Sequence, residues 1–454
     1  MFPPDAIDRF DYDRNQQGCG IVHFGIGAFH RAHQAWYTDR AMSAGDRDWM
    51  ITGVSLRSAA VAHQLDPQGG LYTVTERSAE GEATRLIGAV REVLVATHEA
   101  EAVIARLADP ATRIASFTIT EQGYCRAADG TLDFAAADDS SVYHFLAVGL
   151  RRRRDAGLPG LTLLCCDNLA DNGKQLAQLM SEYLAAHDPA LFGWFDAECT
   201  CPCTMVDRIA PATTEDDRRA VTEALDGLRD EAAVVTEPFS QWVIEDRFAN
   251  GRPRWEAVGA EPVADVASYE SAKLRMLNGA HSALAYLGLR AGHTYVHEAI
   301  ADPALRATIE QLMRAEAQPT LTPASGQNLD AYADALITRF ANPALCHRLI
   351  QIAMDGSQKI PQRWLETLEA NRRMCRSCPA TLAALSAWLG HIRGDNIERW
   401  GPVDDPLAGT FAQLWGEKSS LEVARALIGE RGLFAKHWAA DEAELERVAG
   451  IEPA

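Results

Sequence analysis

The chain has 454 residues, of which 47% are hydrophobic and 23% charged. This is the composition of an ordinary globular protein, and the length predicts about two or three domains. The 43 basic and 63 acidic residues give a formal net charge of −20, a field that repels nucleic acid and anionic membrane surfaces. No apolar run approaches the ~18 residues of a membrane span, and no signal-peptide pattern opens the chain. We therefore expect a cytoplasmic protein with neither nucleic acid nor a membrane as its partner.

A short strand, a glycine turn and a helix are predicted near the amino terminus. The apolar run 21–24 is followed by Gly25-Ile26-Gly27, and residues 32–42 have the composition of a helix. Backbone N–H groups at such a helix start can hold a pyrophosphate. His30 stands where the usual dinucleotide fingerprint has its third glycine, so this turn alone is equally typical of an ordinary loop.

The pattern that follows supports nucleotide binding. Apolar strands are predicted at 49–56, 113–120, 160–168 and 203–211, and a helix begins near Gly173. Continuous apolar strands separated by helices indicate an α/β fold, a Rossmann-like domain with a mostly parallel sheet. In such sheets ligands bind beyond the carboxyl ends of the strands.

The cofactor is expected at the glycine turn and at these strand ends. No acidic residue follows the second strand before Asp66, so the usual ribose ligand of NAD-specific proteins is missing. Arg57 could bind a 2′-phosphate instead, or could be a solvated helix start. We expect NAD, with NADP not excluded, at Gly25, Gly27, Ala28, Phe29, Arg31, Ser55, Arg57, Glu121 and Gly123.

Ten cysteines raise the question of a metal. Two short pairs, Cys201–Cys203 and Cys375–Cys378, are far apart in the chain, and Cys165–Cys166 lies in a predicted buried strand. A structural zinc site usually takes four ligands from two nearby pairs. We expect reduced thiols and no metal.

The second half is predicted to be helical. Apolar residues recur at three- and four-residue spacing over 296–318, 328–342, 345–373 and 381–392. We expect a dinucleotide-binding domain over 1–265 and a mainly α-helical substrate domain over 266–454.

The stretch SAKLRMLNGAHS (271–282) opens the helical domain. On an α-helix Asn278 and His281 share one face, as do Glu270 and Lys273, whereas Lys273 and His281 lie ~12 Å apart along the axis. One interpretation is an amphipathic helix whose polar residues face water. The other is an active site for alcohol oxidation, which needs a base and dipoles that stabilise a developing alkoxide. A lysine can serve as the base because burial disfavours its charged form. The amides of Asn168 and Asn278 could polarise the oxygen, and His281 could bind a neighbouring hydroxyl.

Seven segments resemble the mannitol dehydrogenase family, also called long-chain polyol dehydrogenases. In chain order they are GIGAFHRAHQAWYTD, LYTVTER, TEQGYC, CDNLADNG, CTMVDRIAP, EPFSQWVIEDRFANGRPRWE and KLRMLNGAHS. The resemblance implies a metal-independent NAD(P) dehydrogenase of carbohydrate metabolism, with the site between a Rossmann domain and a helical domain. It implies that Lys273 is the general base and that Asn168 and Asn278 polarise the carbonyl. It also implies that His281 positions the substrate, that Glu270 relays the proton and that Asp207 lies in the site.

Two branches of the family are candidates. One interconverts polyols and ketoses, and the other is the fructuronate reductase branch, which handles sugar acids. The segments TEQGYC, PCTMVDRI, KLRMLNG and DGSQKIPQR resemble the sugar-acid branch. A substrate carboxylate would need a cation, and the candidates are Arg348, Lys359 and Arg363, although arginine is more often surface charge.

We therefore expect an oxidoreductase that interconverts D-fructuronate and D-mannonate with NAD(P). The alternatives are the same chemistry on a neutral polyol or ketose, such as mannitol and fructose, and a nucleotide-binding sensor without turnover. A sensor has no need of Lys273, Asn278 and His281. The sequence gives no sign of the oligomeric state, and monomers occur in the family.

Overall fold

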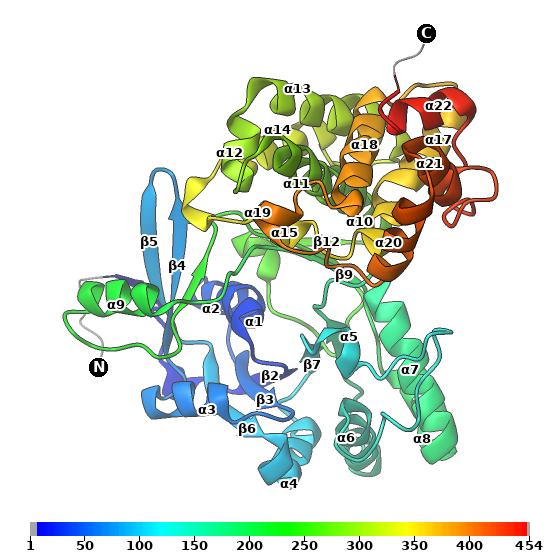
Figure 1. The fold of residues 1–454 in the computed structure, drawn as a ribbon. Coiled ribbons are helices and arrows are strands. Elements are labelled where there is room, and N and C mark those ends of the chain that lie inside the picture. Colours follow the sequence, from blue (N-terminus) through cyan, green and yellow to red (C-terminus); the bar gives the residue numbers. More distant parts are fainter. Residues whose placement is uncertain (1–6, 452–454) are drawn as a thin grey trace. The chain divides into compact units, whose positions relative to one another are not determined.

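The computed structural model describes residues 7–451 and divides into two compact units, one up to Ala267 and one from Ser268 (Figure 1). The first unit is drawn in blue to green and the second in yellow-green to red.

A five-stranded parallel sheet forms the centre of the first unit. Its strand order is β6-β3-β2-β7-β8, and every neighbouring pair is parallel. The strands are β6 (Val90–Val95), β3 (Met50–Ser55), β2 (Cys19–Phe24), β7 (Ile114–Phe117) and β8 (Thr162–Cys165). The Rossmann-like, mostly parallel sheet expected from the continuous apolar strands is confirmed.

Both faces of this sheet are covered. Along β2, Ile21 belongs to one buried cluster, and Val22 and Phe24 belong to another, as the two-residue period of a strand requires. One face packs against helices α1 (Ala28–Ala32) and α2 (Gln34–Ser43). The other packs against helices α4 (Ala96–Ala108), α6 (Val142–Asp155), α7 (Asn172–His187) and α8 (Pro189–Glu198).

Two smaller sheets complete the first unit. One has the order β1-β5-β4-β10 and is built on an antiparallel hairpin; its strands are β1 (Asp8–Arg9), β5 (Gly81–Ile87), β4 (Tyr72–Ser78) and β10 (Val234–Thr236). The other has the order β12-β11-β9, with strands β12 (Glu261–Val263), β11 (Gln241–Glu245) and β9 (Thr204–Asp207). Strand β9 was expected from its apolar sequence. It pairs antiparallel with β11 instead of extending the parallel sheet; the Thr204 hydroxyl of β9 donates to the Cys165 carbonyl of β8 at 2.6 Å, and a bridge joins the preceding Thr200 to Thr162.

The second unit is helical and has one continuous core. Helix α11 (Gly279–Ala291) is almost wholly buried and packs against α12 (Val296–Ala301), α13 (Pro303–Gln311), α15 (Leu349–Ile352) and α18 (Pro379–Arg393). Around them lie α14 (Leu329–Phe340), α16 (Gly356–Ile360), α17 (Glu366–Arg373), α19 (Ile397–Trp400), α20 (Ala408–Glu417), α21 (Ser420–Ile428) and α22 (Glu442–Val448). The expected mainly α-helical domain is confirmed.

The predicted long helices are interrupted in three ways. In 296–318, Pro303 starts a new helix whose first N–H groups are capped by Asp302. In 345–373, Asp355 adopts a left-handed conformation with φ 55°. Three segments are π-helical, η4 (Lys273–Asn278), η5 (Leu312–Ala317) and η8 (Pro361–Leu365).

Candidate active site

The glycine turn leaves the central strand where a dinucleotide would approach. Gly25 has φ +92°, and a Cβ there would lie 2.0 Å from the Thr118 carbonyl oxygen, so only glycine fits. A Cβ at Gly27, the N-cap of α1, would meet nothing nearer than 3.9 Å. The N–H groups that follow Gly27 open α1 and have no acceptor within the helix. The turn is therefore closed on the strand side and open at Gly27.

Two buried histidines, His23 and His30, pack beside this turn. His23 Nε2 lies 2.9 Å from Thr118 Oγ1, which donates to the Gly25 carbonyl at 2.6 Å. The His23 and His30 rings stack with their centroids 3.3 Å apart. Burial lowers the pKa of His23 to about 3, so its ring is neutral. His30, at the place of the third fingerprint glycine, is fully buried.

The ends of the neighbouring strands carry the other predicted cofactor contacts. Ser55 ends β3, and Arg57 is exposed two residues later. The short helix α5 (Thr120–Gly123) follows β7, with Glu121 exposed. The Asp167 carboxylate holds its start by accepting from the Ile119 N–H at 2.9 Å and the Thr120 N–H at 3.2 Å. These segments lie at the carboxyl ends of β3, β2 and β7, which are adjacent strands.

Arg31 has its side chain in the interior. Its guanidinium donates to the Ala232 carbonyl and lies 5.6 Å over the Tyr72 ring. Ala28 and Phe29 begin the same helix and are half-buried. The role of Arg31 toward a cofactor stays a prediction.

Two predicted catalytic residues belong to the first unit. Asn168 is exposed just beyond β8, and Asp207 is buried at the end of β9. Asn172, which the sequence did not single out, joins the two strands: its amide donates to the carbonyls of Asp167 at 3.1 Å and Thr204 at 2.8 Å, and its oxygen accepts from the Thr204 N–H at 2.9 Å.

The segment that contains Lys273, residues 271–282, is not a regular α-helix. Lys273 to Asn278 form the π turn η4, between α10 (Ala267–Ala272) and α11, and the Gly279 N–H reaches the carbonyl of Leu274 five residues back. In an α-helix, residues five apart differ by about 140° in direction at ~100° per residue. The i→i+5 pattern instead brings Lys273 and Asn278 to one side. The expectation of a regular helix was wrong here, and the π turn groups these residues more closely.

The lysine, amide and imidazole differ in exposure. Lys273 is 8% exposed, whereas Asn278 and His281 are half-buried. Within residues 7–451, neither the Asn278 amide nor the His281 ring has a hydrogen-bond partner. Glu270 is half-buried on α10, one turn before Lys273.

His281 lies among aromatic and cationic neighbours. Its ring stacks on Phe340 with centroids 5.5 Å apart and meets His347 edge-on at 4.9 Å. Burial, and then the charges of His347, Arg339, Arg363 and Lys359, hold the pKa of His281 well below its usual range. The ring is neutral and offers one donor and one acceptor.

The three cations proposed for a substrate carboxylate differ in position. Arg363, on the π turn η8, donates to Ser282 Oγ at 2.7 Å and to the Asn278 carbonyl at 3.4 Å. It has no acidic partner in the described part of the chain, and burial lowers its pKa to about 10. Lys359 donates to the Met354 carbonyl at 2.5 Å, and burial and the nearby charge of Arg363 lower its pKa. Arg348 is exposed at the start of α15.

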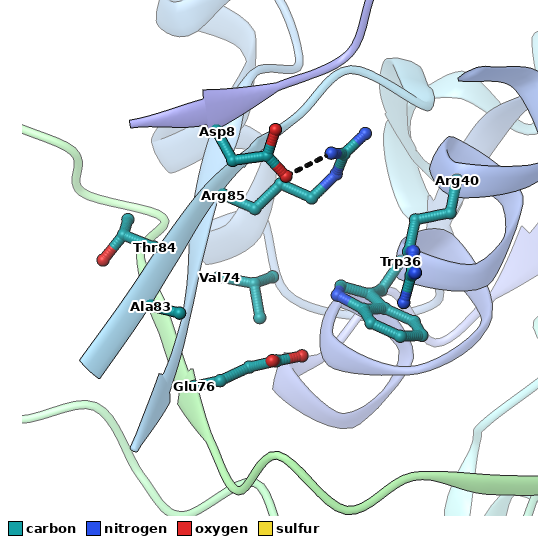
Figure 2. A pocket seen from close by; sticks show the side chains of 8 residues that line it. All are labelled: Asp8, Trp36, Arg40, Val74, Glu76, Ala83, Thr84 and Arg85. Atoms are coloured by element: carbon teal, nitrogen blue, oxygen red, sulfur yellow. Dashed lines mark hydrogen bonds and ion pairs between the residues drawn. The ribbon is translucent and has the colours of Figure 1, made fainter. Parts of the chain in front are cut away.

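Two cavities contain none of the predicted catalytic or cofactor residues. One of about 270 Å³ lies between α2 and the β4–β5 hairpin, where Asp8 pairs with Arg85 at 2.5 Å (Figure 2). The other, of about 390 Å³, lies in the helical unit beside Met354, whose carbonyl holds Lys359. Over residues 7–451 no group of three or more His, Cys, Asp or Glu is arranged to hold a metal ion, and no helix is long and apolar enough to cross a membrane.

A parallel sheet with a glycine turn at its central strand, followed by a helical domain with a buried lysine, is typical of a Rossmann-fold dehydrogenase. The chain belongs to the mannitol dehydrogenase family: residues 19–257 match the mannitol dehydrogenase Rossmann domain and residues 265–448 match the mannitol dehydrogenase C-terminal domain. The resemblance inferred from the sequence is thereby confirmed, and the chain is an oxidoreductase.

The relatives include enzymes named for a sugar acid and enzymes named for a neutral polyol. The chain is 39% identical to the D-mannonate oxidoreductase of Escherichia coli K12, over 94% of this chain and 91% of the relative. It is also 39% identical to the mannitol 2-dehydrogenase of Neosartorya fischeri, over 86% and 81%.

Two solved structures share the fold. Mannitol 2-dehydrogenase of Pseudomonas fluorescens, solved with NAD and D-mannitol, is 35% identical with a TM-score of 0.81, covering 98% of this chain and 94% of that one. A substrate-free D-sorbitol dehydrogenase is 34% identical with a TM-score of 0.89, covering 98% and 95%.

Proposed function

We propose that this protein interconverts D-mannonate and D-fructuronate by hydride transfer, with NAD as its cofactor. The observation that carries the substrate class is Arg363, a partly buried guanidinium without an acidic partner among residues 7–451, beside Asn278 and Ser282. A desolvated charge without a counterion is unfavourable, and a carboxylate is the usual bidentate partner of arginine. Lys359, whose charge acts on Arg363 from nearby, adds a second cation, although it also lies 3.9 Å from the Asp355 carboxylate. The chain is equally identical to a D-mannonate oxidoreductase and to a mannitol 2-dehydrogenase, so identity does not distinguish the two substrates. The proposal of a sugar acid therefore rests on the cationic side chains near Asn278.

The first unit fits a dinucleotide. The open side of the turn at Gly27, the N–H groups at the start of α1, Ser55 and the Thr120–Gly123 segment lie at adjacent strand ends, where such sheets bind nucleotides. A bound nicotinamide ring would supply the hydride acceptor. Arg57 is exposed after β3 and is the residue that would admit a 2′-phosphate, so NADP stays an alternative cofactor.

The helical unit supplies the proton chemistry in this proposal. Lys273 Nζ takes the proton of the substrate hydroxyl during oxidation and returns it during reduction. Asn278, on the same side of the π turn, donates its amide N–H to the reacting oxygen. His281 binds an adjacent hydroxyl, and Glu270 passes the proton onward. The roles of Asn168 and Asp207 in the same reaction rest on the family resemblance.

The first test is the initial rate with D-mannonate and with D-mannitol, each with NAD⁺ and NADP⁺, followed by nicotinamide absorbance. We expect a kcat/KM for D-mannonate at least tenfold above that for D-mannitol. A preference for D-mannitol would overturn the sugar-acid assignment and leave the polyol–ketose alternative, which the mannitol 2-dehydrogenase relatives favour.

Replacing the base separates an enzyme from a nucleotide-binding sensor. Lys273→Ala should lower kcat by about 10²–10⁴-fold, the range of general acid–base catalysis, while NADH binding followed by fluorescence stays near that of the wild type. Unchanged turnover in Lys273→Ala would contradict the mechanism, and absence of turnover in the wild type on every polyol and sugar acid would favour the sensor.

A further inference from the structure

His347 has a backbone that the fold holds in place. It follows a 3₁₀ turn, η7 (Pro343–Leu345), and Cys346, which adopts a left-handed conformation with φ 45°. Its carbonyl accepts from the Val296 N–H at 3.0 Å, and the next residue, Arg348, forms a β-bridge with Tyr295. A non-glycine residue in this conformation is uncommon, so the turn before His347 is a specific feature of the loop.

The His347 ring lies against the substrate-binding histidine. Its centroid is 4.9 Å from that of His281, and the ring planes make an angle of 70°. Neither ring has a hydrogen-bond partner in the described part of the chain, although both are half-buried. Burial and the charge of Arg339 lower the pKa of His347. Two neutral imidazoles therefore lie side by side, each with an unused donor and an unused acceptor.

Packing alone does not explain this pair. Phe340 already stacks on His281, and an aromatic carbon ring at 347 would give the same edge-on contact without nitrogens that need partners. No nitrogen of His281 or His347 is among the fully buried, unpartnered atoms of the described residues, so these nitrogens are accessible to a ligand, and a ligand with several hydroxyl groups could bond both rings.

We propose that His347 is a second substrate-binding imidazole, which with His281 binds neighbouring hydroxyl groups of the sugar chain and sets the specificity for their configuration. This inference rests on the proposed function in one respect, that the substrate is a polyhydroxylated acid or alcohol that binds at His281. A hydroxyl both donates and accepts, so each neutral ring can bind one. Together the two rings recognise a pair of hydroxyls.

The test compares His347→Phe, His347→Asn and His347→Ala with the wild type, on whichever substrate the wild type turns over best. We expect His347→Phe and His347→Ala to raise KM for the sugar about tenfold or more. His347→Asn, which keeps a donor and an acceptor, should recover part of the loss. KM for the nicotinamide cofactor and the thermal midpoint should stay near the wild-type values, as they should in the control His437→Ala, a half-buried histidine of the same unit that lies 3.7 Å from the Glu366 carboxylate.

Monodeoxy analogues of that substrate distinguish binding from packing. The wild type should lose efficiency on the analogue that lacks the hydroxyl bound by His347, whereas His347→Phe should lose nothing further on it. A wild-type KM in His347→Phe, or equal losses on every analogue in wild type and variant, would overturn the inference. Preference for D-mannitol over D-mannonate would instead overturn only the sugar-acid assignment, because the variants can be measured on D-mannitol.

Discussion

Arg363 is held by two neutral oxygens, those of Ser282 and of the Asn278 backbone. The Arg363–Ser282 contact joins residues 81 apart in sequence, and the local sequence pattern of neither segment predicts it. Arg348, Lys359 and Arg363 are equal candidates in the sequence, because a cationic residue in a helical stretch has the same local pattern whether it is buried or exposed. Only the fold separates Arg363, beside the His281 helix, from the exposed Arg348.

Arg363→Met should lower kcat/KM for D-mannonate by about 10–100-fold, because a hydrogen bond to a charged group contributes about 1.5–3 kcal/mol. The value for D-mannitol should change much less, since no carboxylate is present. Steady-state rates on both substrates give the ratio. The matched control is Arg348→Met, which should leave both values near the wild type; a loss in Arg348→Met equal to that in Arg363→Met would contradict the assignment.

At the scale of elements, the glycine turn rests on buried neutral imidazoles. His23 is fully buried, and its pKa is about 3 in the folded protein against 6.5 for a free side chain. His30 is buried beside it, with a pKa well below the usual range. Below pH 6.5 the unfolded chain binds protons that the folded chain cannot, so the folded state loses stability as the pH falls.

Acidification should therefore destabilise the first unit from about pH 6.5 downward. The contribution of His23 is fully present above pH 6.5 and falls by up to about 1.4 kcal/mol per pH unit until pH 3. Denaturant unfolding between pH 4 and pH 8 measures this dependence. His23→Gln should flatten it, and the control His437→Gln should not; a His23→Gln slope equal to that of the wild type would contradict the prediction.

Elements differed in how well their sequences predicted them. The parallel strands were predictable because strands covered on both faces are continuously apolar. The β4–β5 hairpin and the separate sheet of β9 and β11 depend on pairing between distant segments, which one apolar run does not specify. The π turn η4 was not predictable, because KLRMLN consists largely of residues that favour an α-helix.

On the scale of the whole molecule, each unit has its own core. One buried cluster lies wholly within the helical unit, and the clusters that cover the parallel sheet lie within the first unit. Cofactor binding at the glycine turn should therefore act on the unfolding of the first unit. The strand–helix alternation of the first unit and the helical periodicity of the second were predictable from the sequence because each unit buries its own apolar residues.

NAD⁺ at 100 times its Kd should stabilise the folded protein by about 2.7 kcal/mol, which differential scanning calorimetry would record as a higher midpoint. Gly25→Ala should abolish that shift, since the new Cβ would lie 2.0 Å from the Thr118 carbonyl oxygen and displace the turn. Gly193→Ala, at a site with nothing within 4 Å, is the control and should keep it. A full shift in Gly25→Ala would place the nucleotide elsewhere.

The π turn between α10 and α11 ties the number of residues in this helix to the direction in which its lysine and amide point. In a regular α-helix over the same letters, Lys273 and Asn278 would differ by about 140° in direction, so their five-residue spacing suits one face only while the π turn persists. Removing one residue between them would let the segment relax to an ordinary α-helix in which the two stand four apart and differ by only about 40°. A shortened relative would thus present the same two groups on one face of a plain helix, whereas a substitution that straightened the present segment would separate them. For this reason, the length of this segment and its helical form should be compared together when relatives are judged.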